Sequence, residues 1–91
     1  MKYDIEINKE MVLSTCHVTA NEINSGIETS ADEYLNRYLV ESVIEDINEN
    51  SETKDFENLL NLLKIARSHG CKWLVLDCDA DAVEGLPTFN W

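Results

Sequence analysis

Residues 52–76 constrain the fold most, because a leucine-rich helical pattern leads directly into an apolar run of strand length. Apolar residues recur at three- and four-residue intervals over 52–69, as on the buried face of a helix; they are Phe56, Leu59, Leu60, Leu62, Leu63, Ile65 and Ala66. Gly70 follows as a natural left-handed helix cap. The continuous run Trp73–Leu76 then predicts a buried strand that this helix covers on at least one face.

Residues 31–48 predict a second amphipathic helix. Ser30 and Glu33 form a capping-box pattern ahead of it. Apolar residues follow at helical spacing; they are Tyr34, Leu35, Tyr38, Leu39, Val43, Ile44 and Ile47. A strand from Arg37 to Ile44 is the alternative, because this stretch also contains good strand formers. The sequence leaves open whether residues 37–44 are helix or strand.

The N-terminal part of the chain has the pattern of a β-hairpin followed by a short helix. Residues 2–7 alternate polar and apolar side chains, and residues 11–18 are a second β-prone run. Thr19 and Glu22 then have the spacing of a capping box, which predicts a helix ending near Gly26. The whole chain, residues 1–91, is therefore expected to be one small α+β domain. We expect a short, mainly antiparallel sheet of about three strands packed on two main helices.

The net charge narrows the classes of partner. Eighteen acidic and seven basic residues give a net charge of −11. Direct binding to nucleic acid or to an anionic membrane is disfavoured, because proteins recruit those partners through Lys and Arg. No apolar run approaches the ~20 residues of a membrane span. Three cysteines without framework spacing, and no secretion-signal pattern, predict a location in the reducing cytoplasm of a bacterial host.

Acidic residues concentrate in the middle of the chain. Residues 28–57 hold ten acids and two bases, so −8 of the total charge of −11 lies in this third. If the segment is helical, Glu41, Glu45 and Glu49 share one face at intervals of ~6 Å along the axis. A regular row of carboxylates coarsely resembles a phosphate backbone and suits a Lys/Arg-rich groove. The predicted partner-binding residues are Glu41, Glu45, Asp46, Glu49, Glu52 and Asp55.

A cluster of acids after the apolar strand gives the alternative hypothesis, a divalent-metal-binding domain or metal-dependent enzyme. Its residues are Asp77, Asp79, Asp81 and Glu84. The spacing resembles the start of an EF-hand loop, which requires glycine at its sixth position and glutamate at its twelfth. Ala82 and Thr88 stand there instead. We therefore expect no catalytic residue, no cofactor and no enzymatic activity, with metal binding as the second possibility.

Two further expectations concern the apolar residues and the cysteines. The terminal aromatic residues Phe89 and Trp91 are expected to pack back over the core after Leu86-Pro87. The cysteines are expected to be small buried hydrophobic residues, because no Cys-x-x-Cys pair exists. Assembly of a homodimer through the leucine-rich helix is a third possibility.

The C-terminal third carries a resemblance to a known group of proteins. The residues are Gly70, Cys71, Trp73, Leu74, Leu76, Asp77, Cys78 and Asp79, followed by Gly85, Leu86, Pro87 and Trp91, with a weaker match at residues 14–19. In these positions the chain resembles a small family of uncharacterised proteins encoded in bacterial, phage and plasmid genomes. The resemblance implies an accessory protein that inhibits host defence, of the anti-CRISPR or antirestriction type. The expected partner is then a nucleic-acid-binding defence complex.

Overall fold

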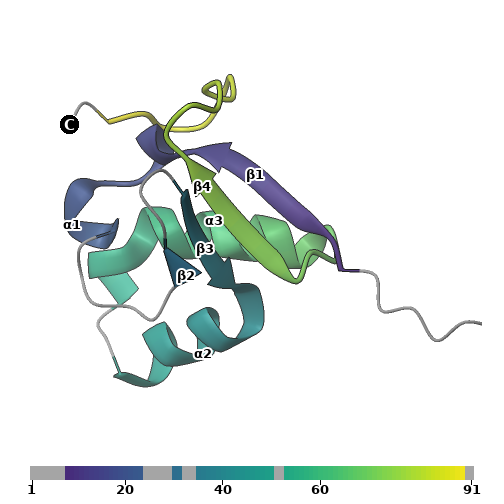
Figure 1. Cartoon of the computed structure of the whole chain (residues 1–91). Helices are drawn as coiled ribbons and strands as arrows, with labels where there is room; N and C mark the ends of the chain where they lie inside the picture. The colour runs from purple at the N-terminus through teal and green to yellow at the C-terminus, as the bar shows by residue number, and fades with distance from the viewer. Residues whose placement is uncertain (1–7, 24–29, 32–34, 51–52, 90–91) are drawn as a thin grey trace, which may run out of the picture.

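The computed structural model describes residues 8–23, 30–31, 35–50 and 53–89 (Figure 1). In chain order the elements are β1 (Glu10–Ser14), the 3-10 turn η1 (Thr15–His17), α1 (Ala20–Ile23), β2 (Ser30–Ala31), β3 (Leu35–Leu39), α2 (Val40–Asn50), the 3-10 turn η2 (Thr53–Phe56), α3 (Glu57–Ser68) and β4 (Trp73–Asp77). A short sheet packs on two main helices, so the predicted α+β fold is confirmed.

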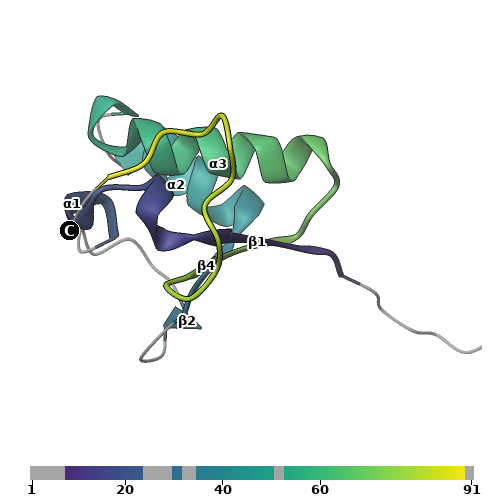
Figure 2. The ribbon, with the colours of Figure 1, turned by 90° about the horizontal axis from the view of Figure 1, so that it is seen from above.

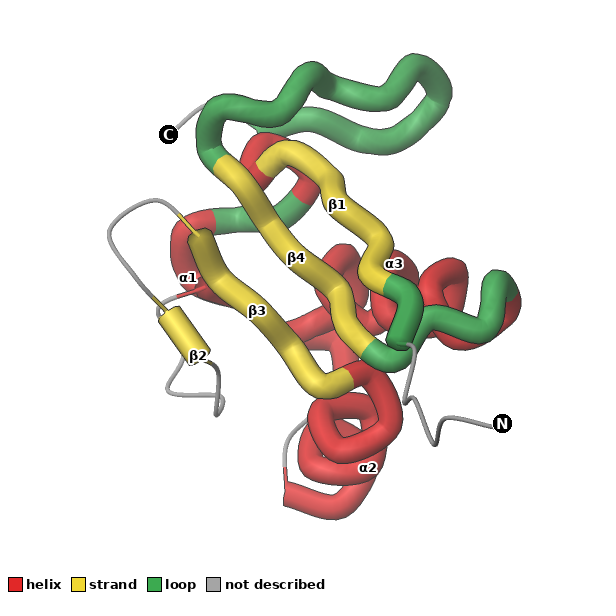
Figure 3. Tube along the Cα trace, turned by 45° about the vertical axis from the view of Figure 1, so that its right-hand side comes forward, coloured by secondary structure: helices red, strands yellow, loops and turns green. Residues whose placement is uncertain are grey.

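The last strand, β4, is the centre of a mixed sheet with the strand order β1-β4-β3-β2 (Figure 3). It runs parallel to β1 and antiparallel to β3, so Val75 lies between Val12 and Arg37. The three central residues of β4, Leu74, Val75 and Leu76, are all buried. A strand without charged residues in its centre suits this position, because β4 is flanked by a strand on each edge and its central side chains are buried.

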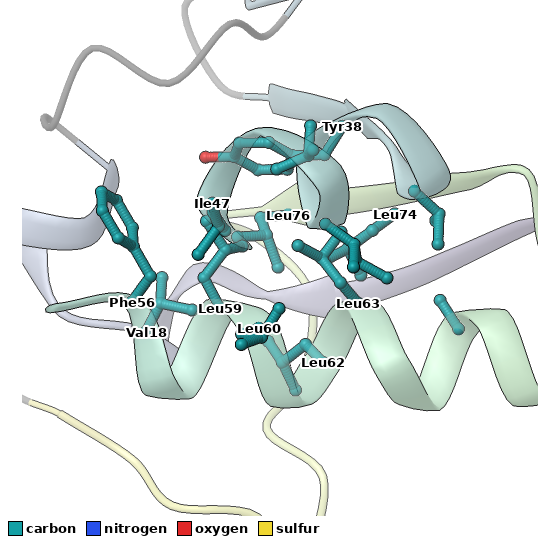
Figure 4. Close-up of a cluster of buried hydrophobic side chains, with 14 of the residues drawn as sticks. Val18, Tyr38, Ile47, Phe56, Leu59, Leu60, Leu62, Leu63, Leu74 and Leu76 are labelled. Atoms are coloured by element: carbon teal, nitrogen blue, oxygen red, sulfur yellow. The ribbon is translucent and has the colours of Figure 1, made fainter. Parts of the chain in front are cut away.

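Helices α2 and α3 lie on the same side of the sheet and bury their apolar faces against it (Figure 2). Figure 4 shows the resulting core, in which side chains of α3 face Leu74 and Leu76 of β4. The fully buried large side chains include Tyr38, Ile47, Leu59, Leu62, Leu63, Leu74 and Leu76. Val75 is also buried but is not part of this cluster, because alternate residues of a strand face opposite sides of the sheet.

Several local predictions are confirmed. The leucine-rich helix ends at Ser68, and Gly70 follows it with φ 73°, a left-handed value that favours glycine. Thr19 and Glu22 form the predicted capping box: the Thr19 N–H donates to Glu22 Oε1 over 2.9 Å, and the Glu22 N–H donates to Thr19 Oγ1 over 3.3 Å. The N–H of Phe89 donates to the Cys16 carbonyl over 2.8 Å, which brings this segment back beside η1, but of the residues after β4 it is Leu86 that packs against the core cluster. Trp91 and residues 2–7 lie outside the described residues.

The prediction of one helix over residues 31–48 is wrong. Residues 35–39 form β3, and the helix begins only at Val40. Tertiary pairing overrides the helical spacing here, because all five residues of β3 pair with β4 and supply the second neighbour that a central strand requires. The alternative strand from Arg37 to Ile44 is right for Arg37–Leu39 only. The β-prone run 11–18 likewise ends early, because Ser14 caps the turn η1 with its side chain.

Candidate acidic interaction surface

The exposed face of α2 carries a regular row of carboxylates. Val40, Val43, Ile44 and Ile47 are buried on the opposite face of this helix, with at most 5 % exposure. Glu41, Glu45 and Glu49 are all exposed, one turn apart, at intervals of ~6 Å along the axis. We call these three glutamates the acidic face. Because the apolar side of the helix is anchored in the core, the acidic face is held in a fixed orientation.

The other predicted partner-binding residues lie around the acidic face rather than on it. Asp46 is half-buried in α2, so it lies at the border. Asp55 is exposed in the following turn η2. Glu52 lies outside the described residues. The structure therefore brings together Glu41, Glu45 and Glu49, with Asp46 beside them and Asp55 in the adjacent element.

Arg37 does not lie on the acidic helix, contrary to the prediction. It belongs to β3, where its guanidinium forms an ion pair with Glu10 of β1 and lies 4.8 Å from the centre of the Trp73 ring. Helix α2 itself contains four acidic residues and no Lys, Arg or His. The mutual repulsion of Glu41, Glu45 and Glu49 is thus not relieved by any cation within their own helix.

The aspartate cluster is assembled only in part. Asp77, Cys78 and Asp79 place their ligand atoms within 4.8 Å of one another, whereas Asp81 and Glu84 are exposed outside this group. Asp77 Oδ1 already accepts the N–H of Asp79 over 2.9 Å, which fixes a tight turn. Partial desolvation, and then the carboxylates of Asp79 and Asp77, raise the pKa of the Cys78 thiol. The thiol is therefore disfavoured as a thiolate ligand or nucleophile.

Two buried polar residues join parts of the chain that are far apart in sequence. The first is Glu22, which is 2 % exposed and whose carboxylate accepts hydrogen bonds from Thr19, Asn58 and Leu59. Besides both Thr19 groups, its carboxylate accepts Asn58 Nδ2 over 3.1 Å and the backbone N–H of Leu59 over 2.8 Å. Leu59 lies in the first turn of α3, whose own cap residue Phe56 has no capping side chain. Glu22 therefore caps α3 from another part of the chain.

The second residue is His17, which is 1 % exposed and joins the turn η1 to the segment after β4. Its Nε2 accepts the N–H of Val83 over 2.9 Å, and its Nδ1 lies 2.8 Å from the carbonyl oxygen of Pro87. This pairing assigns the neutral ring with the proton on Nδ1. Both ring nitrogens are occupied, so His17 is a structural residue.

One depression in the surface of the described residues lies beside η2 and α3. This shallow, open depression of about 430 Å³ is lined by Thr53, Lys54, Glu57, Leu60, Asn61 and Lys64. It has neither a nucleophile beside a base nor a pair of acids. Of the three cysteines, Cys16 and Cys71 are half-buried, but Cys78 is exposed, which corrects the expectation of a buried residue.

Comparison with known proteins places this fold in a family. The model of the "Family of unknown function (DUF5983) C-terminal domain" matches residues 10–91. The chain belongs to this family. The match begins at the first residue of β1 and so covers every described helix and strand, including α2 and β4. Neither the comparison with curated proteins nor the comparison with solved structures gave a match. The expectation of a family without an assigned activity is thus confirmed.

No described helix is suited to the bilayer. The longest, α3, has 12 residues, and none combines the length with the apolar character that a membrane span requires. Both α2 and α3 are amphipathic and pack their apolar faces into the core. The surface feature of the described residues that we consider further is the row of exposed carboxylates that forms the acidic face of α2.

Proposed function

We propose that this chain is a non-enzymatic interaction protein whose acidic face binds a Lys/Arg-lined, nucleic-acid-binding site on a partner protein. The observation that carries the proposal is the row of Glu41, Glu45 and Glu49 on a helix that contains no basic residue. Like charges at this spacing oppose helix formation by a few tenths of a kcal/mol per pair. A partner groove lined with cations would turn that cost into binding energy.

The structural support lies in how firmly the row is held. Ile47 and Val40 of α2 are fully buried, and α2 packs against α3 as well as against the sheet. Fixed charges bind a complementary site with less loss of conformational freedom than charges on a mobile segment. Asp46 and Asp55 extend the negative surface at its border, and we include Glu52 as a sequence-based contact.

The resemblance to proteins of bacterial, phage and plasmid genomes suggests which partner this is. We propose a nucleic-acid-binding defence complex of a bacterial host, inhibited by competition with DNA or RNA in the cytoplasm. This anti-CRISPR or antirestriction role is consistent with a net charge of −11, which disfavours direct binding to nucleic acid.

The test compares two variants of equal net charge. One reverses the acidic face (Glu41→Lys, Glu45→Lys, Glu49→Lys), and the matched control reverses three exposed acids after β4 (Asp79→Lys, Asp81→Lys, Glu84→Lys). Each variant carries three reversals, so both move from −11 to −5. Immobilised wild type, variant and control are exposed to a bacterial lysate, and the retained proteins are eluted with duplex DNA.

We expect the wild type and the control to retain the same nucleic-acid-binding proteins, and the acidic-face variant to lose them. Retention should also weaken steeply as NaCl is raised from about 0.05 M to 0.5 M, because exposed charge pairs are screened. Equal loss in both variants would show that only total charge matters. Unchanged retention by the acidic-face variant would refute the proposal.

Metal binding at Asp77 and Asp79 is the second candidate, because one observation favours it: the ligand atoms of Asp77, Cys78 and Asp79 lie within 4.8 Å. It is the weaker one, since Asp77 already accepts a hydrogen bond and Asp81 and Glu84 are not part of the group. Calorimetric titration with Mg²⁺, Ca²⁺ and Zn²⁺ decides it. Heat that disappears in the Asp79→Lys, Asp81→Lys, Glu84→Lys variant would support this candidate, and no heat would remove it.

A further inference from the structure

We propose that His17 is a pH-sensitive switch: protonation of its ring releases residues 83–89, the segment that returns to the fold after β4. We call this segment the strap. The proposal is independent of the acidic face and of the partner proposed for it. Figure 3 shows the chain after β4 returning to the end of β1, where the turn η1 holds His17.

Hydrogen bonds at Val83, Pro87 and Phe89 attach the strap to η1. The Val83 N–H donates to His17 Nε2 over 2.9 Å, and His17 Nδ1 donates to the Pro87 carbonyl over 2.8 Å. The Phe89 N–H donates to the Cys16 carbonyl, also over 2.8 Å. A single imidazole ring therefore binds the strap at two places, through its two different nitrogens.

The conformation of the strap depends on a turn at Gly85. The Leu86 N–H donates to the Val83 carbonyl over 3.2 Å, and Gly85 has φ 94°, a left-handed value that favours glycine. This turn places the Val83 N–H and the Pro87 carbonyl at the two ring nitrogens. Leu86 packs against the core cluster, whereas most of the other strap residues are exposed. A segment with so little buried apolar surface opens more easily than the core does.

Only the neutral form of the ring fits this arrangement. A neutral imidazole has one N–H group and one acceptor nitrogen, whereas the imidazolium ion has two N–H groups and no acceptor. A proton on Nε2 would point at the Val83 N–H, so that one donor would face another. His17 is 1 % exposed, so water does not replace the lost contact while the strap is closed. Protonation therefore favours the open strap, in which the ring and the Val83 N–H are both solvated.

The charged groups around the ring are acidic, but in the described structure both ring nitrogens bind backbone groups. The titratable groups on the surrounding elements are Cys16, Glu22, Glu57, Asp77, Asp81 and Glu84. Glu22 and Asp77 accept hydrogen bonds from other residues, and the remaining carboxylates are exposed to water. Carboxylic acids and thiols ordinarily titrate at about pH 4 and about pH 8.5, so a change between these values is assigned to histidine.

The direction of the pH effect follows from proton binding. A solvated histidine takes up its proton at about pH 6.5, and the closed strap has no place for that proton. Lowering the pH favours the form that binds more protons, which is the open strap. The ratio of open to closed strap should therefore be constant above about pH 6.5 and rise about tenfold for each pH unit below it.

Nuclear magnetic resonance of the 91-residue chain tests the proposal in two ways. The ring nitrogen signals of His17 at about pH 7.5 should show a neutral ring with its proton on Nδ1. Amide-exchange protection factors, corrected for the intrinsic effect of pH, should fall about 30-fold at Val83 and Phe89 between about pH 7.5 and about pH 5. At each pH they should also be at least about tenfold lower than those of β4.

Three results would overturn the proposal. The first is a His17 ring with its proton on Nε2, and the second is strap protection that does not change with pH. The third is equal protection of the strap and of β4 at every pH, because the strap would then open only when the whole protein unfolds.

Substitutions assign the effect to His17. His17→Gln removes the titrating ring, so the pH dependence of strap protection should be lost, and a fall of the wild-type size would overturn the proposal. His69→Gln is the matched control, because it removes the other histidine of the chain, which is exposed at the end of α3. It should leave the fall intact, and loss of the fall in this variant would also overturn the proposal.

Gly85→Ala separates the strength of the strap from the titration of the ring. Alanine strains the turn at φ 94° but leaves His17 unchanged. Strap protection should therefore be about fivefold lower at every pH, with the same pH dependence as in the wild type. Unaltered protection would overturn the proposed role of the turn. Circular dichroism verifies the fold of each variant, and the wild-type ring signals decide the proposal even if His17→Gln does not fold.

Discussion

Glu22 and the glutamates of the acidic face carry the same side chain in opposite surroundings. Glu22 is 2 % exposed, and its carboxylate accepts hydrogen bonds from Thr19, Asn58 and Leu59. Glu41, Glu45 and Glu49 are exposed on α2. A buried charge is tolerated only when its acceptor positions are filled, whereas an exposed one is solvated by water. The comparison teaches that acid content alone does not separate structural carboxylates from those available to a partner.

Removing the carboxylate of Glu22 should have the largest effect. Glu22→Ala leaves the buried N–H of Leu59 and the Thr19 groups without their acceptor and removes the cap of α3. We expect the free energy of unfolding to fall by about 3 kcal/mol, measured by urea denaturation. Glu45→Ala is the matched control and should change it by less than about 0.5 kcal/mol. Similar losses of unfolding free energy in the two variants would show that the Glu22 carboxylate does not support the fold more than the Glu45 carboxylate does.

Tyr38 is buried, so the stability of the protein at alkaline pH tests the buried environment that it shares with Glu22. Burial, and then the nearby Glu22 carboxylate, raise the pKa of Tyr38 from 10.0 to about 12. The unfolded chain therefore loses the Tyr38 proton at a lower pH than the folded chain does. The contribution of the neutral Tyr38 side chain to the free energy of unfolding is fully present below pH 10 and is lost as the pH rises towards 12. Between these pH values the wild type should lose about 2–3 kcal/mol relative to Tyr38→Phe.

Urea denaturation of both proteins between pH 8 and pH 12 measures this difference, and other titrating groups cancel because the two chains share them. The hydroxyl of Tyr38 is buried without a hydrogen-bond partner in the described structure (Figure 4). Tyr38→Phe should therefore be neutral or up to about 1 kcal/mol stabilising at pH 7. If the free energies of unfolding of the wild type and of Tyr38→Phe depended on pH in the same way, the Tyr38 hydroxyl would not be buried in the folded protein.

Neutralising the acidic face should have the smallest effect on stability. Glu41→Gln, Glu45→Gln, Glu49→Gln removes two like-charge pairs one turn apart, so the chain should gain a few tenths of a kcal/mol. Thermal unfolding in about 0.05 M NaCl measures the gain, which should vanish in about 0.5 M NaCl. A marked loss of stability would mean that these carboxylates support the fold instead of being available to a partner.

The sequence predicted the elements whose signals are local. The leucine pattern, Gly70 and the run Trp73–Leu76 gave α3 and β4, and the capping box gave the start of α1. The positions of Glu41, Glu45 and Glu49 on one exposed helix face also followed from spacing alone. In each case the signal lies in residues that are close together in the chain.

What the sequence did not predict depends on contacts between distant residues. β3 forms because β4 offers it a partner, although Tyr38 and Leu39 also fit a helical pattern. Glu22 caps a helix 37 residues further along the chain, and His17 bonds to Val83 and Pro87 at separations of 66 and 70 residues. Neither pairing leaves a sequence signal, because a Glu or His in a polar segment is ordinary.

The central position of β4 governs when this protein is able to fold during its own synthesis. Val12 and Val75, which lie side by side, are 63 residues apart in the chain, and β4 is the last described strand to be made. While the ribosome is still adding residues before Trp73, β1 and β3 lack the strand that joins them. The nascent chain must therefore hold its leucine-rich helix with no sheet to cover it. Dependence on such distant contacts slows folding and exposes apolar surface to aggregation or chaperones until β4 has been made.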